Sequence, residues 1–410
     1  MRTRRTAHLP FARPDRVTWR ALVLLAAGTL SLGGCAAISR PTSTSVPALL
    51  AEAPATAAAH ASVRDSVRAR LVRRAVARND RTLDLLLLSG GGQHGAYGVG
   101  FLRGWAARAE SPMPRFDLVS GISTGALQAP FALLGTPAAL DTITALYRAA
   151  ADRIAPTFDW WFWIRRTGGI VNTDRYERSL RNTVSPALRD QLQAEFAQGR
   201  QLLTATTDMD LGIGRIWDLT TELGTDDAAL ARTHTLLYTA TAIPGIFPPR
   251  IVDGHVHSDG GVIANVLPVL DLADYRALAE ELRRAGITEP VRVRLWVVMN
   301  LWTHAAPRVV SPSSRGRISS RSSEILFWAA MPQALRRLEE LARAVSADVP
   351  GLSLEVRVTQ PPAWLATEPG ADKLFDRKWM ERLEALGFER ARSSAPWDST
   401  WSAYVRPPAR

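Results

Sequence analysis

The most constraining feature of the sequence is a largely apolar run at residues 83–88, which is followed by three consecutive glycines at 90–92. A run of this length without polar alternation is typical of a strand that is buried on both faces. Residues 96–109 then have the pattern of a helix, and residues 116–119 form a second short strand pattern. This succession of strand, glycine loop, helix and strand favours an α/β domain with parallel strands.

The alternation of strand and helix patterns continues toward the C-terminus. Residues 124–134 and 375–387 have helical patterns, and the second of these is expected to stop at Gly387. Residues 305–323 are rich in Ala, Pro, Ser and Arg and are expected to form a surface loop. Further strands are expected at residues 201–207, 215–218, 291–299 and 352–358. The sequence therefore predicts an α/β fold with a mostly parallel central sheet.

The formal charge of +11 does not indicate nucleic-acid binding. Only Lys373 and Lys378 are lysines, so Arg supplies nearly all of the positive charge, and six of the arginines lie in residues 1–34. The sequence has no basic run interleaved with aromatic residues, so no nucleic-acid partner is expected. The single cysteine, Cys35, excludes an intramolecular disulfide and a cysteine-based zinc site.

The N-terminal residues resemble the signal peptide of a bacterial lipoprotein. A basic segment at residues 2–20 precedes an apolar stretch at residues 21–32, which is too short to span a bilayer. The stretch ends in Leu-Gly-Gly followed by Cys35, as in a lipobox. The resemblance implies lipidation of Cys35 and, because Ala36 follows it, sorting to the outer membrane of a bacterial cell envelope. A plain secretory peptide with an incidental cysteine is the alternative.

Two segments follow Cys35 before the first predicted strand. Residues 36–61 are rich in Ala, Pro, Ser and Thr without a hydrophobic period, and we expect them to be a flexible tether. Residues 63–78 are expected to form an Arg-rich helix that packs on the domain, with contact to an anionic membrane surface as the alternative. The apolar face of this helix is expected to contain Val63, Val67, Leu71 and Val76.

Residues 121–125 read Gly-Ile-Ser-Thr-Gly, a G-x-S-x-G motif between a predicted strand and a predicted helix. In this context Ser123 lies on a strained turn at the carboxyl edge of the sheet, near a helix N-terminus that favours negative charge. Gly121 and Gly125 are needed because side chains at these positions would collide with neighbouring backbone. Ser123 is therefore a candidate nucleophile.

Residues 90–95 read Gly-Gly-Gly-Gln-His-Gly and join the first strand to the first helix. Consecutive glycines allow backbone N–H groups to converge on an anion or an oxyanion. A Walker loop is excluded because no Lys-Ser or Lys-Thr follows. A dinucleotide fold would need an acidic residue at the end of the next strand, where the G-x-S-x-G motif lies instead. The loop, which closes at Gly95, is therefore interpreted as an oxyanion hole.

A third motif, Asp-Gly-Gly at residues 259–261, follows the sequence Ala-Ile-Pro-Gly-Ile-Phe-Pro-Pro at residues 242–249. Asp259-Gly260 alone is first of all a turn signal. The glycine loop, the G-x-S-x-G motif and the Asp-Gly-Gly motif with Gly261, in this order, resemble the patatin-like phospholipase family. The resemblance covers roughly residues 83–300.

This resemblance implies a three-layer α/β/α fold, a reaction and the residues that perform it. A patatin-type site has a Ser–Asp dyad, which by position assigns Ser123 as the nucleophile and Asp259 as the base. Backbone N–H groups of Gly91 and Gly92, with Gly90 as a third, would stabilise the oxyanion. The implied activity is phospholipase A or esterase type hydrolysis of phospholipids or other acyl lipids through an acyl-enzyme, with no metal or organic cofactor.

The histidines do not extend this dyad to a triad. His255 and His257 precede Asp259, whereas an α/β-hydrolase has its histidine after the acid, and only His304 follows here. His255 and His257 have the spacing of two metal ligands on one strand face. No third or fourth ligand of matching quality is found, so a surface strand pair is favoured and no metal is expected. His94, where many relatives have Arg or Lys, is interpreted as a loop residue.

The sequence thus divides into four predicted segments. These are a signal peptide (1–34), a tether with a basic helix (35–80), a catalytic core (81–305) and a C-terminal α/β extension packed on the core (306–410). We predict a membrane-anchored serine lipid acyl hydrolase. The alternative is a non-catalytic surface lipoprotein that binds lipid or a protein partner.

Residues 158–166 are dense in aromatic residues and end in two arginines. Ordinary packing under a loop is the favoured interpretation of this segment. The alternative is a position at a bilayer interface, with the aromatic rings at headgroup depth and the arginines on lipid phosphates.

Overall fold

A computed structural model of the chain describes residues 38, 40, 44–78, 80–373 and 375–398. The predicted signal peptide and Cys35, the predicted site of lipidation, lie outside the described residues. Among the helices of the described part, none is both long and apolar enough to cross a membrane.

The fold is built on a mixed sheet with the strand order β10-β9-β1-β2-β5-β8-β7, in which β6 also pairs with β5. The strands β10, β9, β1, β2 and β5 run parallel to one another. Antiparallel pairing is confined to one end, where β6 and β8 pair with β5, and β7 pairs with β8. The strands of this sheet are β1 (Thr82–Leu88), β2 (Leu118–Gly121), β5 (Gln201–Asp208), β6 (Ile213–Asp218), β7 (Arg250–Val252), β8 (His255–Asp259), β9 (Val291–Val298) and β10 (Leu352–Thr359). The predicted mostly parallel sheet is confirmed.

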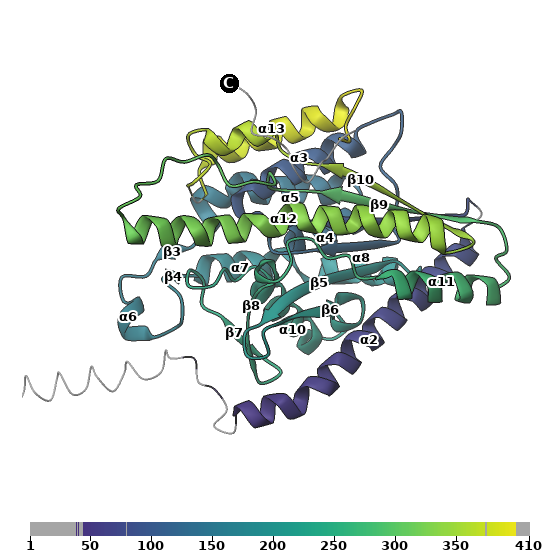
Figure 1. Cartoon of the computed structure of the whole chain (residues 1–410), viewed down its shortest axis with the longest axis horizontal. Helices are drawn as coiled ribbons and strands as arrows, with labels where there is room; N and C mark the ends of the chain where they lie inside the picture. Colours follow the sequence, from purple (N-terminus) through teal and green to yellow (C-terminus); the bar gives the residue numbers. More distant parts are fainter. Residues whose placement is uncertain (1–37, 39, 41–43, 79, 374, 399–410) are drawn as a thin grey trace, which may run out of the picture.

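Helices cover both faces of the sheet (Figure 1). The longer helices are α2 (Val46–Ala77), α3 (Gly95–Ala106), α4 (Thr124–Leu134), α5 (Pro137–Ala149), α7 (Asp174–Thr183), α8 (Pro186–Ala197), α10 (Asp227–Ala240), α11 (Leu272–Arg284), α12 (Arg315–Asp348) and α13 (Arg377–Arg392). The shorter elements are α6 (Phe162–Arg165), α9 (Leu219–Glu222), the 3-10 helices η2 (Gly92–His94), η4 (Gly260–Val262) and η5 (Ala363–Thr367), the π-helix η3 (Ala150–Ile154), and a separate ribbon of β3 (Thr157–Phe158) and β4 (Val171–Asn172).

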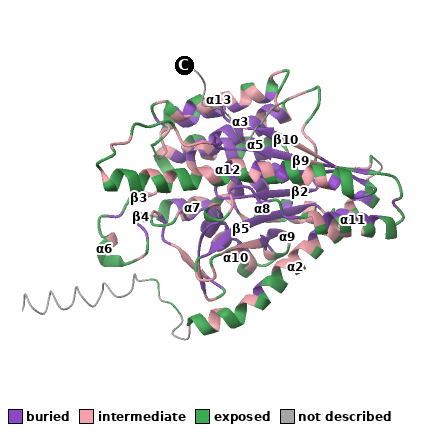
Figure 2. Ribbon diagram, viewed as in Figure 1, coloured by how far each residue is buried: buried purple, intermediate pink, exposed green. Residues whose placement is uncertain are grey.

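The sheet separates two apolar cores, which fill the centre of the molecule (Figure 2). Leu86 and Leu88 of β1 belong to the core beneath α3, α4, α5, α10 and α13, whereas Leu85 and Leu87 belong to the core beneath α2, α11 and α12. Successive side chains of a strand point to opposite faces, so an uninterrupted apolar run is needed when both faces are covered. The α/β/α fold class is therefore confirmed.

The predicted tether and basic helix need correction, because α2 already begins at Val46 and residues 46–61 are helical. Ser45 caps the helix by accepting a hydrogen bond from the backbone of Ala48, and the Ala-rich sequence that follows favours a helix. The helix packs on the domain, as predicted, through a buried stripe that consists of Val67, Leu71 and Ala75. Val76, which was expected on this face, is 53% exposed.

Two predictions near the C-terminus also need correction. The expected loop 305–323 is helical from Arg315, where α12 begins. Gly387 does not stop a helix, because α13 continues to Arg392. A Cβ at Gly387 would lie 2.1 Å from the carbonyl oxygen of Tyr97, and one at Gly100 would lie 2.0 Å from that of Glu384. Gly387 therefore allows close backbone contact between α13 and α3.

The aromatic segment 158–166 does not pack under a loop, so that prediction is wrong. Trp160, Trp161 and Trp163 are 78%, 58% and 65% exposed around the short helix α6. Phe158 contacts the rings of Trp160 and Phe162, so part of the segment packs against itself. The remaining indole surface is available to a partner.

Candidate active site

Ser123 lies on a sharp turn between β2 and α4, with φ 51° and ψ −123°. A positive φ is rare for a residue with a side chain and indicates local strain. The flanking glycines make this turn sterically feasible. A Cβ at Gly121 would lie 2.2 Å from the carbonyl oxygen of Gly125, and one at Gly125 would lie 2.3 Å from that of Leu88. The turn therefore has the geometry that the G-x-S-x-G motif predicts.

Asp259 reaches Ser123 from the end of β8. The hydroxyl of Ser123 donates a hydrogen bond to Asp259 Oδ2 over 2.6 Å, while the N–H of Gly261 donates to Asp259 Oδ1 over 2.7 Å. The strand itself is held by antiparallel pairing of Thr206 with Asp259. Gly260 lets the chain pass close to β5, because a Cβ there would lie 2.5 Å from a carbonyl oxygen of that strand. The two predicted residues thus meet.

The environment of Asp259 makes it a stronger base than an exposed carboxylate. Burial raises the pKa of Asp259 from 3.8 to about 6, although the hydrogen bonds from Ser123 and Gly261 act in the opposite direction. Asp259 is 5% exposed and Ser123 is 7% exposed. Near neutral pH the carboxylate is mostly ionised and has a higher proton affinity than in water, which suits a general base.

The glycine loop passes directly beside Ser123, but its three N–H groups are not equivalent. The N–H of Gly90 donates to the carbonyl oxygen of Asn265 over 3.1 Å, so the prediction that Gly90 contributes to an oxyanion hole is not supported. A Cβ at Gly90 would lie 3.2 Å from that of Ser123, which shows how close the loop is. Gly91 and Gly92 remain the candidate donors, and Gly92 adopts a φ of +56° that favours glycine.

His94 stabilises this loop as a neutral side chain. Its Nδ1–H donates to the carbonyl oxygen of Gly91 over 3.0 Å, and its ring makes edge contacts with Trp302 and Trp379. Burial lowers the pKa of His94, so the imidazole is uncharged at neutral pH. The loop position at which the resemblance described above implies Arg or Lys therefore has no cation here.

Sequence analysis missed two asparagines that border the site. Asn300 donates from its backbone N–H to Ser89 Oγ over 2.8 Å and from its side chain to the Ser89 carbonyl over 2.6 Å. These bonds join the end of β9 to the start of the glycine loop. Within the part of the chain that the structure describes, Asn265 Nδ2 is buried without a hydrogen-bond partner. A single asparagine outside a motif carries no sequence signal, so neither residue could have been predicted.

An apolar pocket opens at Ser123. Leucine, isoleucine and phenylalanine side chains of α4, α5, α7, α10 and the segment after α10 line most of its wall. Phe375 and Met380 add a wall from the C-terminal segment. Gln93 of the glycine loop holds this segment by donating to the carbonyl oxygen of Gly370 over 3.1 Å and accepting from the N–H of Asp376 over 2.8 Å.

Gly95 closes the glycine loop at the start of α3, where a side chain would not fit. A Cβ there would lie 2.3 Å from Thr124 Oγ1 and 2.5 Å from the hydroxyl oxygen of Tyr147. Thr124 and Tyr147 hydrogen-bond to each other and both line the pocket. Gly95 therefore lets the loop approach the first turn of α4, directly behind Ser123.

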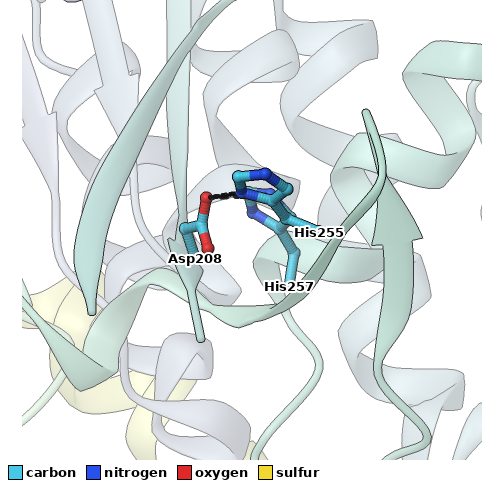
Figure 3. A group of neighbouring side chains, drawn as sticks. All are labelled: Asp208, His255 and His257. Carbon is cyan, nitrogen blue, oxygen red and sulfur yellow. Dashed lines mark hydrogen bonds and ion pairs between the residues drawn. The ribbon is translucent and has the colours of Figure 1, made fainter. Parts of the chain in front are cut away.

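The prediction that His255 and His257 form a surface strand pair is wrong, because they are only 5% and 0% exposed. Asp208, at the end of β5, lies with them, and the nearest ligand atoms of the three residues are all within 4.8 Å of one another (Figure 3). The third group comes from another strand, which is why the local spacing of the histidines did not reveal it.

A serine on a strained strand-to-helix turn, hydrogen-bonded to a buried carboxylate beside a glycine loop, is the arrangement expected of a serine acyl hydrolase. The family model of the patatin-like phospholipases matches residues 86–273, which include Ser123, Asp259 and the glycine loop. A search of curated proteins finds no significant match. The predicted resemblance is thus confirmed for this region, and the match supports a family of lipid acyl hydrolases.

Proposed function

We propose that the protein is a serine lipid acyl hydrolase of phospholipase A or esterase type, with Ser123 as the nucleophile and Asp259 as the base. The single observation that supports this most directly is the 2.6 Å hydrogen bond from Ser123 Oγ to Asp259 Oδ2 at the mouth of an apolar pocket. The two residues are 136 positions apart in the sequence, so local turn formation does not account for their contact.

In the first half of the proposed reaction, Ser123 Oγ attacks the carbonyl carbon of an acyl ester while its proton passes to Asp259 Oδ2. The carbonyl oxygen becomes an oxyanion, which the N–H groups of Gly91 and Gly92 stabilise. The tetrahedral intermediate then collapses. The bond to the alcohol breaks, the alkoxide takes the proton from Asp259, and an acyl-enzyme on Ser123 remains.

In the second half, water hydrolyses the acyl-enzyme by the same steps. Asp259 removes a proton from the water, whose oxygen attacks the acyl carbonyl and forms a second oxyanion. Collapse breaks the bond to Ser123 Oγ, which recovers its proton from Asp259, and a fatty acid leaves. A carboxylate is a weak base toward a hydroxyl, so the rate depends strongly on positioning and on oxyanion stabilisation.

The pocket supports an acyl chain as the group that is transferred. Its wall is mostly apolar, with Leu127, Ile143 and Phe247 among the lining side chains, and Ser123 is part of the lining. Removal of apolar area from water favours binding of a hydrocarbon chain by about 0.8 kcal/mol per buried methylene. A phospholipid or another acyl lipid would place its chain here and its ester at Ser123.

A membrane location is part of the proposal. Lipidation of Cys35 would anchor the chain in the bacterial outer membrane, and the exposed indoles of Trp160, Trp161 and Trp163 are suited to the interface of a bilayer. Arg165 and Arg166 follow them; Arg165 pairs with Asp159 over 3.2 Å, and Arg166 carries charge that complements lipid phosphate. A lipid substrate would then diffuse to the pocket within the same membrane.

The proposal is tested with the full chain in detergent, beside its Ser123→Ala and Asp259→Asn variants. Each protein receives a short-chain chromogenic ester and then mixed phospholipid micelles. We expect both variants to lose at least about a thousandfold of the wild-type kcat/KM, as removal of a catalytic nucleophile or base does in serine hydrolases. Matching far-UV circular dichroism spectra of the three proteins would show that the fold is retained.

Substantial residual activity in either variant would exclude the dyad. Activity of the wild-type protein on neither substrate, together with no labelling of Ser123 by an active-site serine probe, would favour the non-catalytic alternative. Lipid would then bind in the pocket without turnover.

A further inference from the structure

A second group of buried ionisable side chains lies on the same strand as the catalytic aspartate. His255, His257 and Asp259 are every second residue of β8, and Asp208 is paired with His257 across the β5–β8 ladder. Two residues of a strand span about 7 Å, so this cluster is a neighbour of the catalytic pair but not part of it. The function proposed above makes no use of these side chains.

One nitrogen of each imidazole, here called the inner nitrogen, faces the same carboxylate oxygen; the other ring nitrogen is called the outer one. His255 Nδ1 lies 2.6 Å from Asp208 Oδ2, and His257 Nε2 lies 3.8 Å from the same atom (Figure 3). The other carboxylate oxygen, Asp208 Oδ1, accepts the backbone N–H groups of Asp210 and Leu211, each over 3.0 Å. These two bonds orient the carboxylate so that Oδ2 stays directed at the histidines.

The outer nitrogens have hydrogen-bond partners of their own. His255 Nε2 lies 2.8 Å from Glu52 Oε2 on α2, and His257 Nδ1 lies 2.9 Å from Thr206 Oγ1. Metal-binding histidines usually donate their second ring N–H to a carboxylate or another oxygen, which fixes the tautomer and raises the ligand's basicity. The hydrogen bond of its outer nitrogen therefore fixes the orientation of each imidazole, with the inner nitrogen directed at Asp208.

The inner nitrogen of His257 has no partner in the described part of the chain. When Nδ1–H donates to Thr206, Nε2 is left as an unprotonated lone pair. This atom is buried and makes no hydrogen bond among the described residues. Thr206 Oγ1 also accepts from Trp217 Nε1–H over 2.8 Å, so the tautomer of His257 depends on where the Thr206 hydroxyl proton points. In the tautomer with Nδ1 protonated, a lone pair lies 3.8 Å from a carboxylate oxygen with no proton between them, an unfavourable arrangement that a cation would convert into a favourable one.

We propose that Asp208, His255 and His257 bind a divalent metal ion of the zinc class. Two imidazoles and one carboxylate match the ligand preference of zinc, whereas calcium and magnesium prefer sites made of oxygen atoms. The proposal does not rest on the acyl hydrolase function. With three protein ligands, water would complete the coordination of the ion.

Only small side-chain movements are needed to accommodate the ion. Zinc bonds of about 2.0–2.2 Å in tetrahedral geometry separate the ligands by roughly 3.3–3.6 Å. The His257–Asp208 separation of 3.8 Å is close to this, and the His255–Asp208 contact of 2.6 Å must open by about 1 Å. The ligand nitrogens of His255 and His257 lie within 4.8 Å of each other and must approach by up to about 1.5 Å. A proton on His255 Nδ1 would leave to solvent as the metal binds, so binding should weaken in acid.

One neighbouring cation opposes the metal and offers a test. Arg215 Nη1 lies 3.8 Å from Asp208 Oδ2, and its guanidinium lies over the ring of Trp217. Repulsion between this charge and a bound dication should reduce affinity. Neutralising Arg215 should therefore tighten binding, a gain that a merely damaged fold would not produce.

The metal would act on the position of β8. It would join β5 to β8 two residues before Asp259, and through Glu52 it would connect this ladder to α2. A bound ion would thus hold the strand that delivers the catalytic carboxylate. The role is one of positioning, because the structure gives the cluster no contact with Ser123.

The experiment measures metal binding directly, on the full chain in detergent. Every protein carries Cys35→Ser, so that an unlipidated thiol does not compete, and is stripped with a chelator and dialysed. Zinc chloride is titrated by calorimetry, and bound zinc is measured by mass spectrometry after desalting. The parent protein is expected to bind one zinc per chain, and to bind neither magnesium nor calcium at comparable concentrations.

The variants assign the site. Asp208→Asn retains the oxygen that accepts the two backbone N–H groups but loses the charged ligand, and His257→Gln loses the unpartnered nitrogen. We expect each to weaken zinc binding by about 100-fold or more, since loss of even an outer partner costs 10- to 100-fold. His304→Gln, on a loop away from the cluster, should bind like the parent. Arg215→Gln should bind more tightly.

Two outcomes would overturn the proposal. One is the absence of zinc binding by the parent, and the other is equal affinity in the parent, Asp208→Asn and His257→Gln. Either would make the cluster a hydrogen-bonded network only. If the ligand variants fail to fold, cobalt(II) substitution of the parent decides instead. Visible absorption bands of a four- or five-coordinate nitrogen and oxygen site are expected, and bands of hydrated cobalt alone would refute the site.

Discussion

Replacement of Asp259 by Asn is expected to abolish activity and to stabilise the fold at the same time. Asp259 is buried, and its pKa is raised from 3.8 to about 6 chiefly because burial disfavours the ionised carboxylate. An Asn side chain has nearly the same shape, cannot ionise and still offers an oxygen to the N–H of Gly261. The variant therefore removes the buried charge while leaving the packing in place.

The magnitude follows from the shift in pKa. A difference of about 2 pKa units between folded and unfolded states corresponds to about 3 kcal/mol. Because the folded-state pKa is the higher one, the stability contributed by the proton on Asp259 is fully present below pH 3.8. It is lost as the pH rises through about 6. At pH 8 the Asn variant should exceed the wild type in unfolding free energy by about 2–3 kcal/mol, and the gain should vanish near pH 4.

The measurement is urea unfolding followed by tryptophan fluorescence, at pH 8 and at pH 4, with chelator present so that no bound cation contributes. Ser123→Ala is the matched control, because it is also expected to be inactive but should change the stability in the opposite direction. It removes the hydrogen bond that Ser123 donates to the ionised carboxylate, so it should destabilise the protein by about 1–3 kcal/mol at pH 8.

The reasoning would be refuted if Asp259→Asn were no more stable than wild type at pH 8, or if its gain were the same at pH 4 and pH 8. Either result would mean that the carboxylate is not buried in its ionised form. Destabilisation by both variants would mean that the hydrogen bond between Ser123 and Asp259 stabilises the protein by more than the buried charge of Asp259 destabilises it.

Three further predictions follow from the same geometry. The kcat/KM for a neutral ester should be constant above pH 7 and should fall tenfold per pH unit below about pH 6, because the proposed base Asp259 becomes protonated. A flat pH–rate profile down to pH 4 would contradict this role. Gly125→Ala should lose more than about 3 kcal/mol of stability or fail to fold, because its Cβ would lie 2.3 Å from a carbonyl oxygen. Gly316→Ala, which has open space around it, is the control and should unfold at the wild-type temperature or slightly above it. Equal melting temperatures for the two variants would be inconsistent with the turn described here. Leu127→Trp should lower kcat/KM for long-chain esters about tenfold or more while sparing a two-carbon acyl group, and equal losses on both esters would show that the pocket does not hold the chain.

Much of the local structure was predictable because it is encoded by short-range patterns. The β1 run predicted a strand covered on both faces, and α4 was predicted at Thr124–Leu134, where the structure has it. The glycines at 121 and 125 were predicted from the steric needs of a serine turn, and each would collide with backbone if it carried a Cβ. These features depend on residues that are neighbours in the chain.

Errors arose where local composition was ambiguous between two structures. Residues 46–61 contain Ala, Pro, Ser and Thr, which suit a tether, yet a capping serine and high alanine content form a helix there. Gly387 resembles a helix stop, but its function is to let α13 contact the backbone of α3. The tryptophans of 158–166 were expected to be covered, and no local pattern reports which side of a loop faces solvent.

The sequence by itself determined the α/β class, the strained serine turn at residues 121–125 and the order of the three motifs. Only the tertiary structure decided how these parts function together. The register of β8 on β5 places Asp208 opposite His257, crossover connections bring Asp259 to Ser123, and a bond to Asn265 removes the N–H of Gly90 from the candidate donors. The physical reason is that strand register and long-range hydrogen bonds join residues far apart in the chain, and spacing within a motif carries no information about them.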